Sequence, residues 1–227
     1  MSRRTFRPAL AFHVLTPLYD WATDLVGFGA PFVSRVADSL ALRETESVLD
    51  VGCGTGTLLA ELGHRYPRAA VAGIDADFRM LARARRKLVS AQVRATLVQA
   101  YAQHLPFSAG TFDAVVSTLI FHHLGTPLKQ AALGEIHRVL KPGGRFLLAD
   151  FGKPETALQW TVLSIGRLFD GIESTRANLQ GRLPLMLSES GFRVAEIAPR
   201  YRGVQFLRAT RAGGYNGERW PIHSPRT

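Results

Sequence analysis

Residues 48–59 read Val48-Leu49-Asp50-Val51-Gly52-Cys53-Gly54-Thr55-Gly56-Thr57-Leu58-Leu59. An apolar run of strand-forming residues comes first, glycine then stands at every second position, and helical apolar spacing begins at Leu58. The sequence therefore predicts a strand that passes through a glycine turn into a helix starting at Thr55 or Gly56. Glycine suits such a turn, because a Cβ would block a positive φ and the approach of a ligand to bare amides. The helix start adds N–H groups and a positive dipole end.

A second predicted strand, residues 70–74, ends in Asp75, nineteen residues after Gly56. This is where a βαβ nucleotide-binding unit places a carboxylate on ribose hydroxyls. A dinucleotide fingerprint requires a third glycine three residues after the second, and Thr57 stands there instead. An NAD-dependent enzyme is therefore a more distant alternative.

The spacing of Gly52, Gly54 and Gly56 after Asp50 resembles the first motif of the class I S-adenosylmethionine-dependent methyltransferases. Further motifs of this family are matched in order, and together the matches span residues 48–150. They are Gly73-Ile74-Asp75 with Met80-Leu81, then Leu105-Pro106-Phe107, then Phe112 to Ser117, then Leu140-Lys141-Pro142-Gly143-Gly144.

The resemblance implies an α/β fold, a three-layer Rossmann-like sandwich with a mostly parallel seven-stranded sheet and an antiparallel last strand. We expect an N-terminal helical cap at 1–42, the methyltransferase domain at 43–210 and a flexible basic tail at 211–227. The motifs at 17–20 and 27–29 resemble the N-terminal segment of quinone-biosynthesis C-methyltransferases and some bacterial phospholipid N-methyltransferases. There this segment covers the cofactor and shapes the substrate pocket; the alternative is that Tyr19 only packs a helix on the domain.

The resemblance also implies the cofactor S-adenosyl-L-methionine, with S-adenosyl-L-homocysteine as the product. By this likeness the first motif holds the methionine part, Asp75 binds the ribose and the loop after the third strand encloses adenine. Relatives commonly carry an acid where Tyr101 stands, so adenine would be bound by backbone at 100–103 or by Tyr101. The expected cofactor-binding residues are Asp50, Gly52, Cys53, Gly54, Gly56, Asp75, Ala76, Met80, Tyr101, Ala102, Leu105 and Ser117.

Cys53 is the one cysteine of the chain, which excludes a disulfide framework and a zinc cluster, and no metal is expected. As a side chain it suits filling space in the turn better than acting as a nucleophile.

The segment after the fourth strand reads Ser117-Thr118-Leu119-Ile120-Phe121-His122-His123-Leu124. It lacks the Asn- or Asp-Pro-Pro-aromatic motif of enzymes that methylate nucleobase amino groups, and its apolar residues suit a hydrophobic acceptor. His122 and His123 are candidate bases, because neutral imidazole takes up a proton near pH 7; the alternative is that they pack the loop.

Asp150, at the end of the fifth strand, is a candidate base or acceptor contact, or a loop cap. The catalytic candidates are therefore His122, His123, Asp150 and Tyr19.

The helix after Asp75 is predicted to begin at the N-cap Asp77, with Phe78, Leu81 and Leu88 facing inward. Five cations on it, Arg79, Arg83, Arg85, Arg86 and Lys87, are expected to face mostly outward. They could bind phosphate or lipid headgroups, or form a solvated face. The formal net charge of +10 favours anionic surroundings without choosing among them.

Two helices are expected between 155 and 190. The first has a broad apolar arc from Leu158 to Phe169, which is compatible with a core role, a pocket wall or partial membrane contact. The second is lined by Leu179, Leu183, Met186 and Leu187.

No apolar run in the sequence reaches the length of a membrane-spanning helix. Residues 2–6 resemble a twin-arginine signal, but His13 and then Tyr19-Asp20 interrupt the apolar stretch that follows. A cytoplasmic location is therefore expected, and peripheral membrane contact stays open.

The predicted function is in-line methyl transfer from S-adenosylmethionine to a hydrophobic small molecule, a quinone or a lipid headgroup. Because the sulfonium is already electrophilic, the protein mainly has to align the acceptor, exclude water and remove a proton if one must leave. An RNA-directed methyltransferase and a non-catalytic cofactor-binding module are the alternatives. The acceptor atom and the oligomeric state stay open.

Overall fold

A single seven-stranded sheet organises the computed structural model, which describes residues 27–156, 159 and 172–211. The strands are β1 Ser47–Val51, β2 Ala70–Asp75, β3 Thr96–Gln99, β4 Phe112–Thr118, β5 Leu140–Phe151, β6 Phe192–Tyr201 and β7 Val204–Arg211. Their order is β3-β2-β1-β4-β5-β7-β6, and β7 is antiparallel to both of its neighbours. This arrangement confirms the predicted fold class. The cap before residue 27, including Tyr19, the helix expected around 158–169 and the tail after 211 lie outside the described residues.

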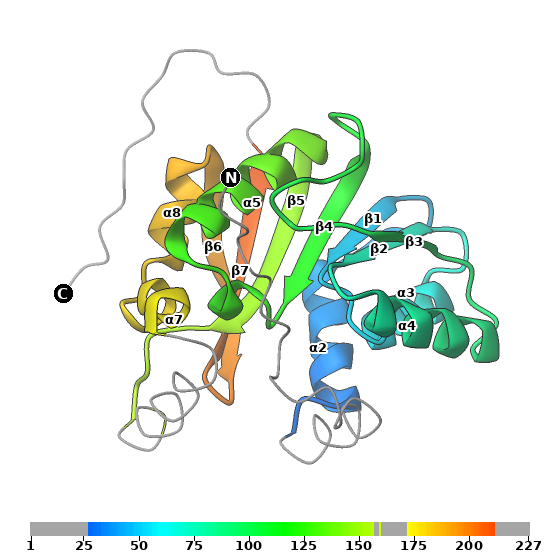
Figure 1. Cartoon of the computed structure of the whole chain (residues 1–227), viewed down its shortest axis with the longest axis horizontal. Coiled ribbons are helices and arrows are strands. Elements are labelled where there is room, and N and C mark those ends of the chain that lie inside the picture. The colour runs from blue at the N-terminus through cyan, green and yellow to red at the C-terminus, as the bar shows by residue number, and fades with distance from the viewer. Residues whose placement is uncertain (1–26, 157–158, 160–171, 212–227) are drawn as a thin grey trace, which may run out of the picture.

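Helices cover both faces of the sheet (Figure 1). One layer holds α2 Ala30–Leu40, α3 Thr57–Arg65 and α4 Phe78–Ser90; the other holds α5 Thr126–Val139, α7 Ile172–Leu179 and α8 Leu183–Glu189. Successive side chains of a strand point to opposite faces of the sheet, so the hydrophobic core is divided between the two helix layers. On β5, Phe146 and Leu148 pack toward the α5 layer, while Leu147 and Ala149 pack toward the α2 layer. Asp150 therefore emerges on the α5 side.

The strand order reverses between β1 and β4, which are neighbours although β2 and β3 intervene in sequence. Open parallel sheets bind ligands beyond the carboxyl ends of their strands at such a switch point. The glycine turn follows β1 here, Asp75 ends β2 and the short 3-10 helix η2, Phe121–His123, follows β4. The topology thus gathers most of the predicted site residues at one edge.

Two local predictions were wrong. Phe78, expected to face inward, is 61% exposed, because it lies on a different side of α4 from the buried Ala84 and Leu88. Leu179 and Leu183 do not share a helix, since a turn with Gly181 at φ +68° separates α7 from α8. The motif from Leu140 to Gly144 forms the start of β5, where the pairing with β4 shifts register between Phe112 and Ala114.

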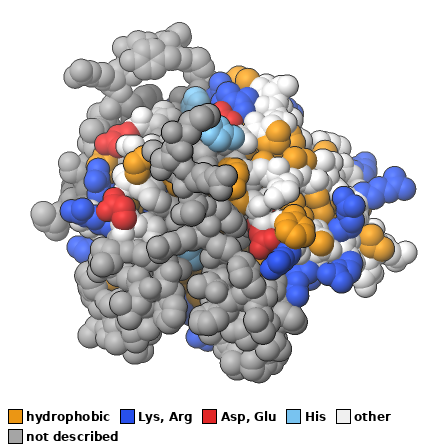
Figure 2. All heavy atoms as spheres, in the orientation of Figure 1, with side chains coloured by type: hydrophobic (Ala, Val, Ile, Leu, Met, Phe, Trp, Pro, Cys, Tyr) orange, Lys and Arg blue, Asp and Glu red, His pale blue; other side chains and the backbone are white. Residues whose placement is uncertain are grey.

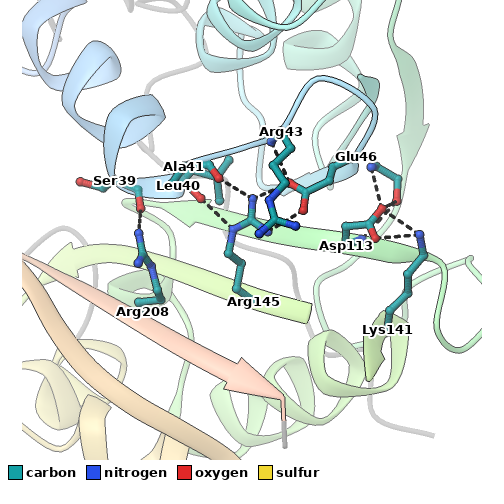
Figure 3. A network of polar contacts seen from close by, with 10 residues as sticks. Ser39, Leu40, Ala41, Arg43, Glu46, Asp113, Lys141, Arg145 and Arg208 are labelled. Carbon is teal, nitrogen blue, oxygen red and sulfur yellow. Dashed lines mark hydrogen bonds and ion pairs between the residues drawn. The ribbon is translucent and has the colours of Figure 1, made fainter. Parts of the chain in front are cut away.

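A network of polar contacts lies at the opposite end of the sheet from the candidate site, around the amino-terminal ends of the parallel strands (Figure 3). Arg145 on β5 donates to the Leu40 and Ala41 carbonyls, each at 2.8 Å, and to both carboxylate oxygens of Glu46. The hydrogen bond from Arg145 holds the pKa of Glu46 below its usual value. Nearby, Lys141 Nζ lies 2.8 Å from both oxygens of Asp113. These contacts join α2 and its following loop to the central strands, at the end away from the candidate site.

Candidate active site

The glycine turn after β1 holds three residues with positive φ, and they differ in what surrounds them. A Cβ on Gly52 would lie 2.1 Å from Ile120 Cδ1, and one on Gly56 would lie 2.9 Å from Ala84 Cβ. These two glycines therefore allow close packing against η2 and α4. Around Gly54, at φ +52°, no described residue other than its chain neighbours has an atom within 4 Å of the Cβ position. Gly54 is the point of the turn where main chain borders open space.

Asp75 joins this turn to the start of α4. Its Oδ2 accepts a hydrogen bond from the Gly54 amide at 2.9 Å, and its Oδ1 accepts one from the Asp77 amide at 2.8 Å. Burial raises the pKa of the Asp75 carboxyl, and the two N–H donors oppose this rise. Each carboxylate oxygen can accept a further hydrogen bond. The group therefore fits a pair of ribose hydroxyls.

Asp50, at the end of β1, is 1% exposed, and its Oδ1 has no hydrogen-bond partner among the described residues. Burial, with Asp75 nearby, raises the pKa of the Asp50 carboxyl to about 8. A buried oxygen without a donor is costly, and a cation would favour the ionised form. Asp50 thus fits a ligand that carries an amino group. Together with the open Gly54 and the Asp75 carboxylate, it forms a set of residues suited to S-adenosylmethionine.

Three other predicted cofactor residues take part in the scaffold through the atoms that the structure records. Cys53 Sγ lies 3.0 Å from the Cβ position of Gly73, and burial raises the pKa of the thiol, so it stays protonated. Ser117 Oγ donates to the Val51 carbonyl at 2.9 Å, which ties β4 to β1. The Ala76 carbonyl accepts from Gln99 Nε2 at 3.0 Å. Their backbone contacts with a cofactor stay predictions.

The expected adenine side is built from β2, α4 and the loop after β3. The Ala100 amide donates to the Asp75 carbonyl at 3.1 Å, which holds this loop beside the carboxylate that is predicted to bind the ribose. Ala102 and Leu105 are buried, Met80 is half-buried and Tyr101 is 47% exposed. The loop therefore offers an apolar floor with an exposed aromatic ring, in place of the acid that relatives commonly carry.

Asp150 is the most heavily hydrogen-bonded carboxylate of the site, with 0% exposure. Its Oδ1 accepts from His122 Nδ1, Asn178 Nδ2 and the Phe151 amide at 2.7–3.0 Å, and its Oδ2 accepts from the Phe121 amide at 2.7 Å. Burial alone would raise the pKa of this carboxyl, but His122 and then Lys129 outweigh it and hold the pKa below its usual value. Such a carboxylate positions its donors. Both of its oxygens already accept hydrogen bonds from protein donors, which argues against the predicted role as a base.

His122 is held by this carboxylate at the end of β4. Asp150 Oδ1 faces Nδ1 at 3.0 Å, and in the neutral ring this contact favours the tautomer with the proton on Nδ1 and an acceptor at Nε2. The His122 ring lies 4.0 Å from that of His123 and 5.0 Å from that of Phe151. His122 is 8% exposed and His123 is half-buried. This geometry suits proton acceptance at His122.

The apolar residues before the histidines do not line one surface together. Phe121 is fully buried and its ring packs 6.1 Å from that of Phe146, so its predicted contact with an acceptor is wrong. Ile120 packs over Gly52, and Leu119 has φ +54°, a strained value for a residue with a Cβ. The segment mainly turns the chain from β4 into η2.

Two site residues, Lys129 and Asn178, were missed by sequence reasoning. Lys129 on α5 has no exposure, and its Nζ donates to the carbonyls of Leu124 and Ser174. Burial lowers its pKa to about 8, although Asp150 and Glu173 oppose this shift. Neither residue belongs to a motif. Lys129 could have been noticed as a cation on the inward face of a helix, three and four residues before two apolar ones, Ala132 and Leu133.

The basic run on α4 is only partly exposed. Arg79, Arg85 and Arg86 are exposed, while Arg83 and Lys87 are half-buried. Lys87 Nζ donates to Thr57 Oγ1 at 2.6 Å and to Thr55 Oγ1 at 3.1 Å, which ties α4 to the first turn of α3. Basic and hydrophobic side chains alternate along the side of the molecule where α4 lies (Figure 2).

Within the ranges that the structure describes, no group of three or more His, Cys, Asp and Glu side chains is placed to hold a metal ion. In the same ranges, no helix combines the length and apolar character needed to cross a membrane.

Comparison with known proteins agrees with this geometry. Residues 48–144 match the family model described as a methyltransferase domain. An uncharacterized methyltransferase of Synechocystis sp. is 34% identical over 173 residues, covering 76% of this chain and 79% of that protein. A ubiquinone/menaquinone biosynthesis C-methyltransferase of Syntrophotalea carbinolica is 39% identical over 149 residues, 65% of this chain. The match spans only 62% of that relative's length.

Among solved structures, a SAM-dependent methyltransferase of Aquifex aeolicus superposes with a TM-score of 0.70 at 22% identity. The superposition covers 92% of this chain and 100% of that one, and it supports the fold.

Proposed function

Since the chain belongs to the class I S-adenosylmethionine-dependent methyltransferases, we propose that it methylates a ring carbon of a hydrophobic, quinone-type acceptor in its reduced, hydroxylated form. The observation that carries the cofactor half is the set of Gly54, Asp50 and Asp75 at the ends of β1 and β2. The acceptor class is supported by the ubiquinone/menaquinone C-methyltransferase at 39% identity and by a demethylmenaquinone methyltransferase of Thermus thermophilus at 40%.

When bound, S-adenosylmethionine supplies an electrophilic methyl group, whose bond to sulfur breaks with the electron pair remaining on sulfur. Asp75 would hold the ribose hydroxyls, and Asp50 would accept from the amino group, which orients the methionine part over Gly54. The chain's task is then to align an acceptor carbon and to raise its electron density.

His122 is the residue suited to the second task. With Nδ1–H donated to Asp150, its Nε2 can take the proton of a ring hydroxyl. Loss of that proton gives a phenolate, whose ring carbon is nucleophilic enough to form the new C–C bond. Asp150 stabilises the imidazolium that forms. The methylated ring carbon then loses its hydrogen as a proton to water, which restores the aromatic ring as a phenolate. That phenolate takes back the proton held by His122, so one proton is released to solvent for each methyl group transferred.

Labelled-methyl S-adenosylmethionine, incubated with the full chain and a dithionite-reduced 2-prenyl-1,4-naphthoquinone, tests this function. We expect label on carbon of the naphthoquinol, identified by mass spectrometry, and release of S-adenosylhomocysteine. A lipid fraction and an RNA fraction of a bacterial extract serve as competing acceptors. Label confined to RNA, lost as salt rises, would replace the quinone proposal with the RNA-directed alternative.

A further inference from the structure

Three buried polar side chains meet at the carboxyl end of β5, on the sheet face covered by α7. Asp150 and Gln205 are directly opposite each other in the antiparallel β5–β7 pair, so their side chains project from the same face. Asn178 comes from α7, which covers that face, and its Nδ2 lies 3.0 Å from Asp150 Oδ1. Exposure is 0% for Asp150, 2% for Gln205 and 1% for Asn178. A polar cluster thus interrupts the apolar layer beside His122.

The orientation of the Asn178 amide is fixed by its partners. Its Nδ2 donates to Asp150 Oδ1 and, at 2.9 Å, to the Phe151 carbonyl. Both partners can only accept, so the NH₂ group must face them and Oδ1 must point elsewhere. That oxygen is buried, and within the described part of the chain nothing donates to it.

Gln205 carries a buried hydrogen-bond donor that lacks an acceptor, whereas Asn178 carries an acceptor that lacks a donor. Its Nε2 is buried and finds no acceptor within residues 27–156, 159 and 172–211. Its amide carbon lies 3.0 Å from the Cβ position of Gly152, so the chain after β5 approaches it only because that residue is glycine. An unused acceptor and an unused donor therefore accompany the same carboxylate. Buried polar atoms are rarely left without partners in native proteins.

We infer that Asn178 and Gln205 form a subsite for a hydroxyl group of the methyl acceptor; this rests on the proposed function. A hydroxyl can donate to Asn178 Oδ1 and accept from Gln205 Nε2, whereas an ether or keto oxygen can only accept. Asp150 joins this subsite to the base, because His122 and Asn178 share its Oδ1. The subsite would thereby select the reduced, hydroxylated acceptor and hold its ring relative to His122.

Calorimetry with two probes tests the subsite on the full chain loaded with S-adenosylhomocysteine. The probes are 1,4-dihydroxynaphthalene, kept anaerobic, and 1,4-dimethoxynaphthalene, which has no hydroxyl. In Gln205→Met, which leaves Asp150 and its donors intact, we expect the affinity for the dihydroxy probe to fall roughly three- to tenfold and that for the dimethoxy probe to stay unchanged. Asn178→Leu should act in the same sense. The exposed Gln180 provides the matched control, because Gln180→Leu removes an amide just beyond the same helix.

Three outcomes would overturn the subsite. The first is an equal loss of affinity for both probes in Gln205→Met, and the second is no binding of the dihydroxy probe to the unsubstituted protein. The third is unchanged affinity for both probes, which would mean that the two amides hold a buried water only. Methyl transfer to the reduced naphthoquinone separates this test from the proposed function. If no label reaches the naphthoquinol, the proposed function fails; if label is transferred and the probes are not distinguished, only the subsite fails.

Discussion

The Asp75 carboxylate accepts a hydrogen bond from the Gly54 amide at 2.9 Å, across 21 positions of sequence. This contact joins Asp75 to the glycine turn, because the carboxylate that is predicted to bind the ribose also holds the amide of Gly54, the glycine of this turn that borders open space. Its other oxygen holds the start of α4. The two halves of the predicted cofactor site are therefore rigidly connected before any ligand arrives.

Replacing Asp75 should weaken cofactor binding without unfolding the protein. Asp75→Asn removes the charge that strengthens the hydrogen bonds to ribose hydroxyls, so we expect the affinity for S-adenosylhomocysteine to fall by about 1–3 kcal/mol in calorimetry. Asp77→Asn is the matched control, since asparagine also caps helices and the side chain of Asp77 contacts the α4 N-terminus. An unchanged dissociation constant in Asp75→Asn would remove the ribose from this position.

Asp50 should make cofactor binding depend on pH. Its pKa is raised to about 8 in the free protein, so at pH 7 it is mostly protonated. A bound amino group favours the ionised form, and binding should release a proton whose heat differs between buffers of different ionisation enthalpy. Affinity should rise between pH 6 and 8. In Asp50→Asn the proton release should disappear; if it persists, another group is responsible.

The same raised pKa has a consequence for the protein without ligand. Between about pH 4 and 8 the folded state holds a proton on Asp50 that the unfolded state releases, so stability from this group falls as pH rises. Asp50→Asn should therefore raise the melting temperature at pH 8.5 more than at pH 5. A destabilised variant at pH 8.5 would show that Asp50 has a partner in the free protein.

His122→Gln should lower kcat by about 10²-fold while leaving S-adenosylhomocysteine binding unchanged, because it removes a proton acceptor and not a cofactor contact. His123→Gln is the control, since its ring lies beside that of His122 and the ring hydrogen bond to Asp150 Oδ1 comes from His122 Nδ1. Initial rates on the reduced naphthoquinone decide between them. Equal losses in the two variants would contradict the assignment of the base to His122.

Lys129 should make the free energy of unfolding depend on pH between pH 8 and pH 10.5. Its folded pKa is about 8 and its unfolded value is about 10.4, so between these values the unfolded state binds the extra proton and stability rises with pH. Relative to Lys129→Met, the wild type should gain up to about 3 kcal/mol in the free energy of unfolding from pH 8 to pH 10.5. Urea titrations at the two pH values measure this, and parallel curves would refute it.

Arg145 should matter for stability and not for binding. Arg145→Met removes a partly buried guanidinium that holds Glu46 and two carbonyls at the edge away from the site, so we expect about 2–3 kcal/mol of destabilisation. Arg68→Met is the comparison, because its ion pair with Glu44 is exposed and should contribute little. Cofactor affinity at a temperature where each variant is folded should not change.

The sequence alone determined the class of fold, because the glycine turn, Asp75 and the alternating strand and helix patterns are local signals. The mostly parallel seven-stranded sheet with an antiparallel last strand, which the family resemblance implies, is the sheet that the structure has. Local pattern also predicted the α4 cap at Asp77. It failed at Phe78, whose exposure depends on which side of α4 packs against the rest of the domain.

Only the tertiary structure decided how the acceptor side is built. Its groups come from four separate elements: Asp150 from β5, His122 from η2, Lys129 from α5 and Asn178 from α7. Their contacts cannot be predicted from their spacing in the sequence. Whether a carboxylate acts as a base or positions one depends on how many donors surround it and on its burial, which are properties of the folded chain. Local chemistry therefore specified the cofactor edge, while long-range packing specified the groups beside the methyl acceptor.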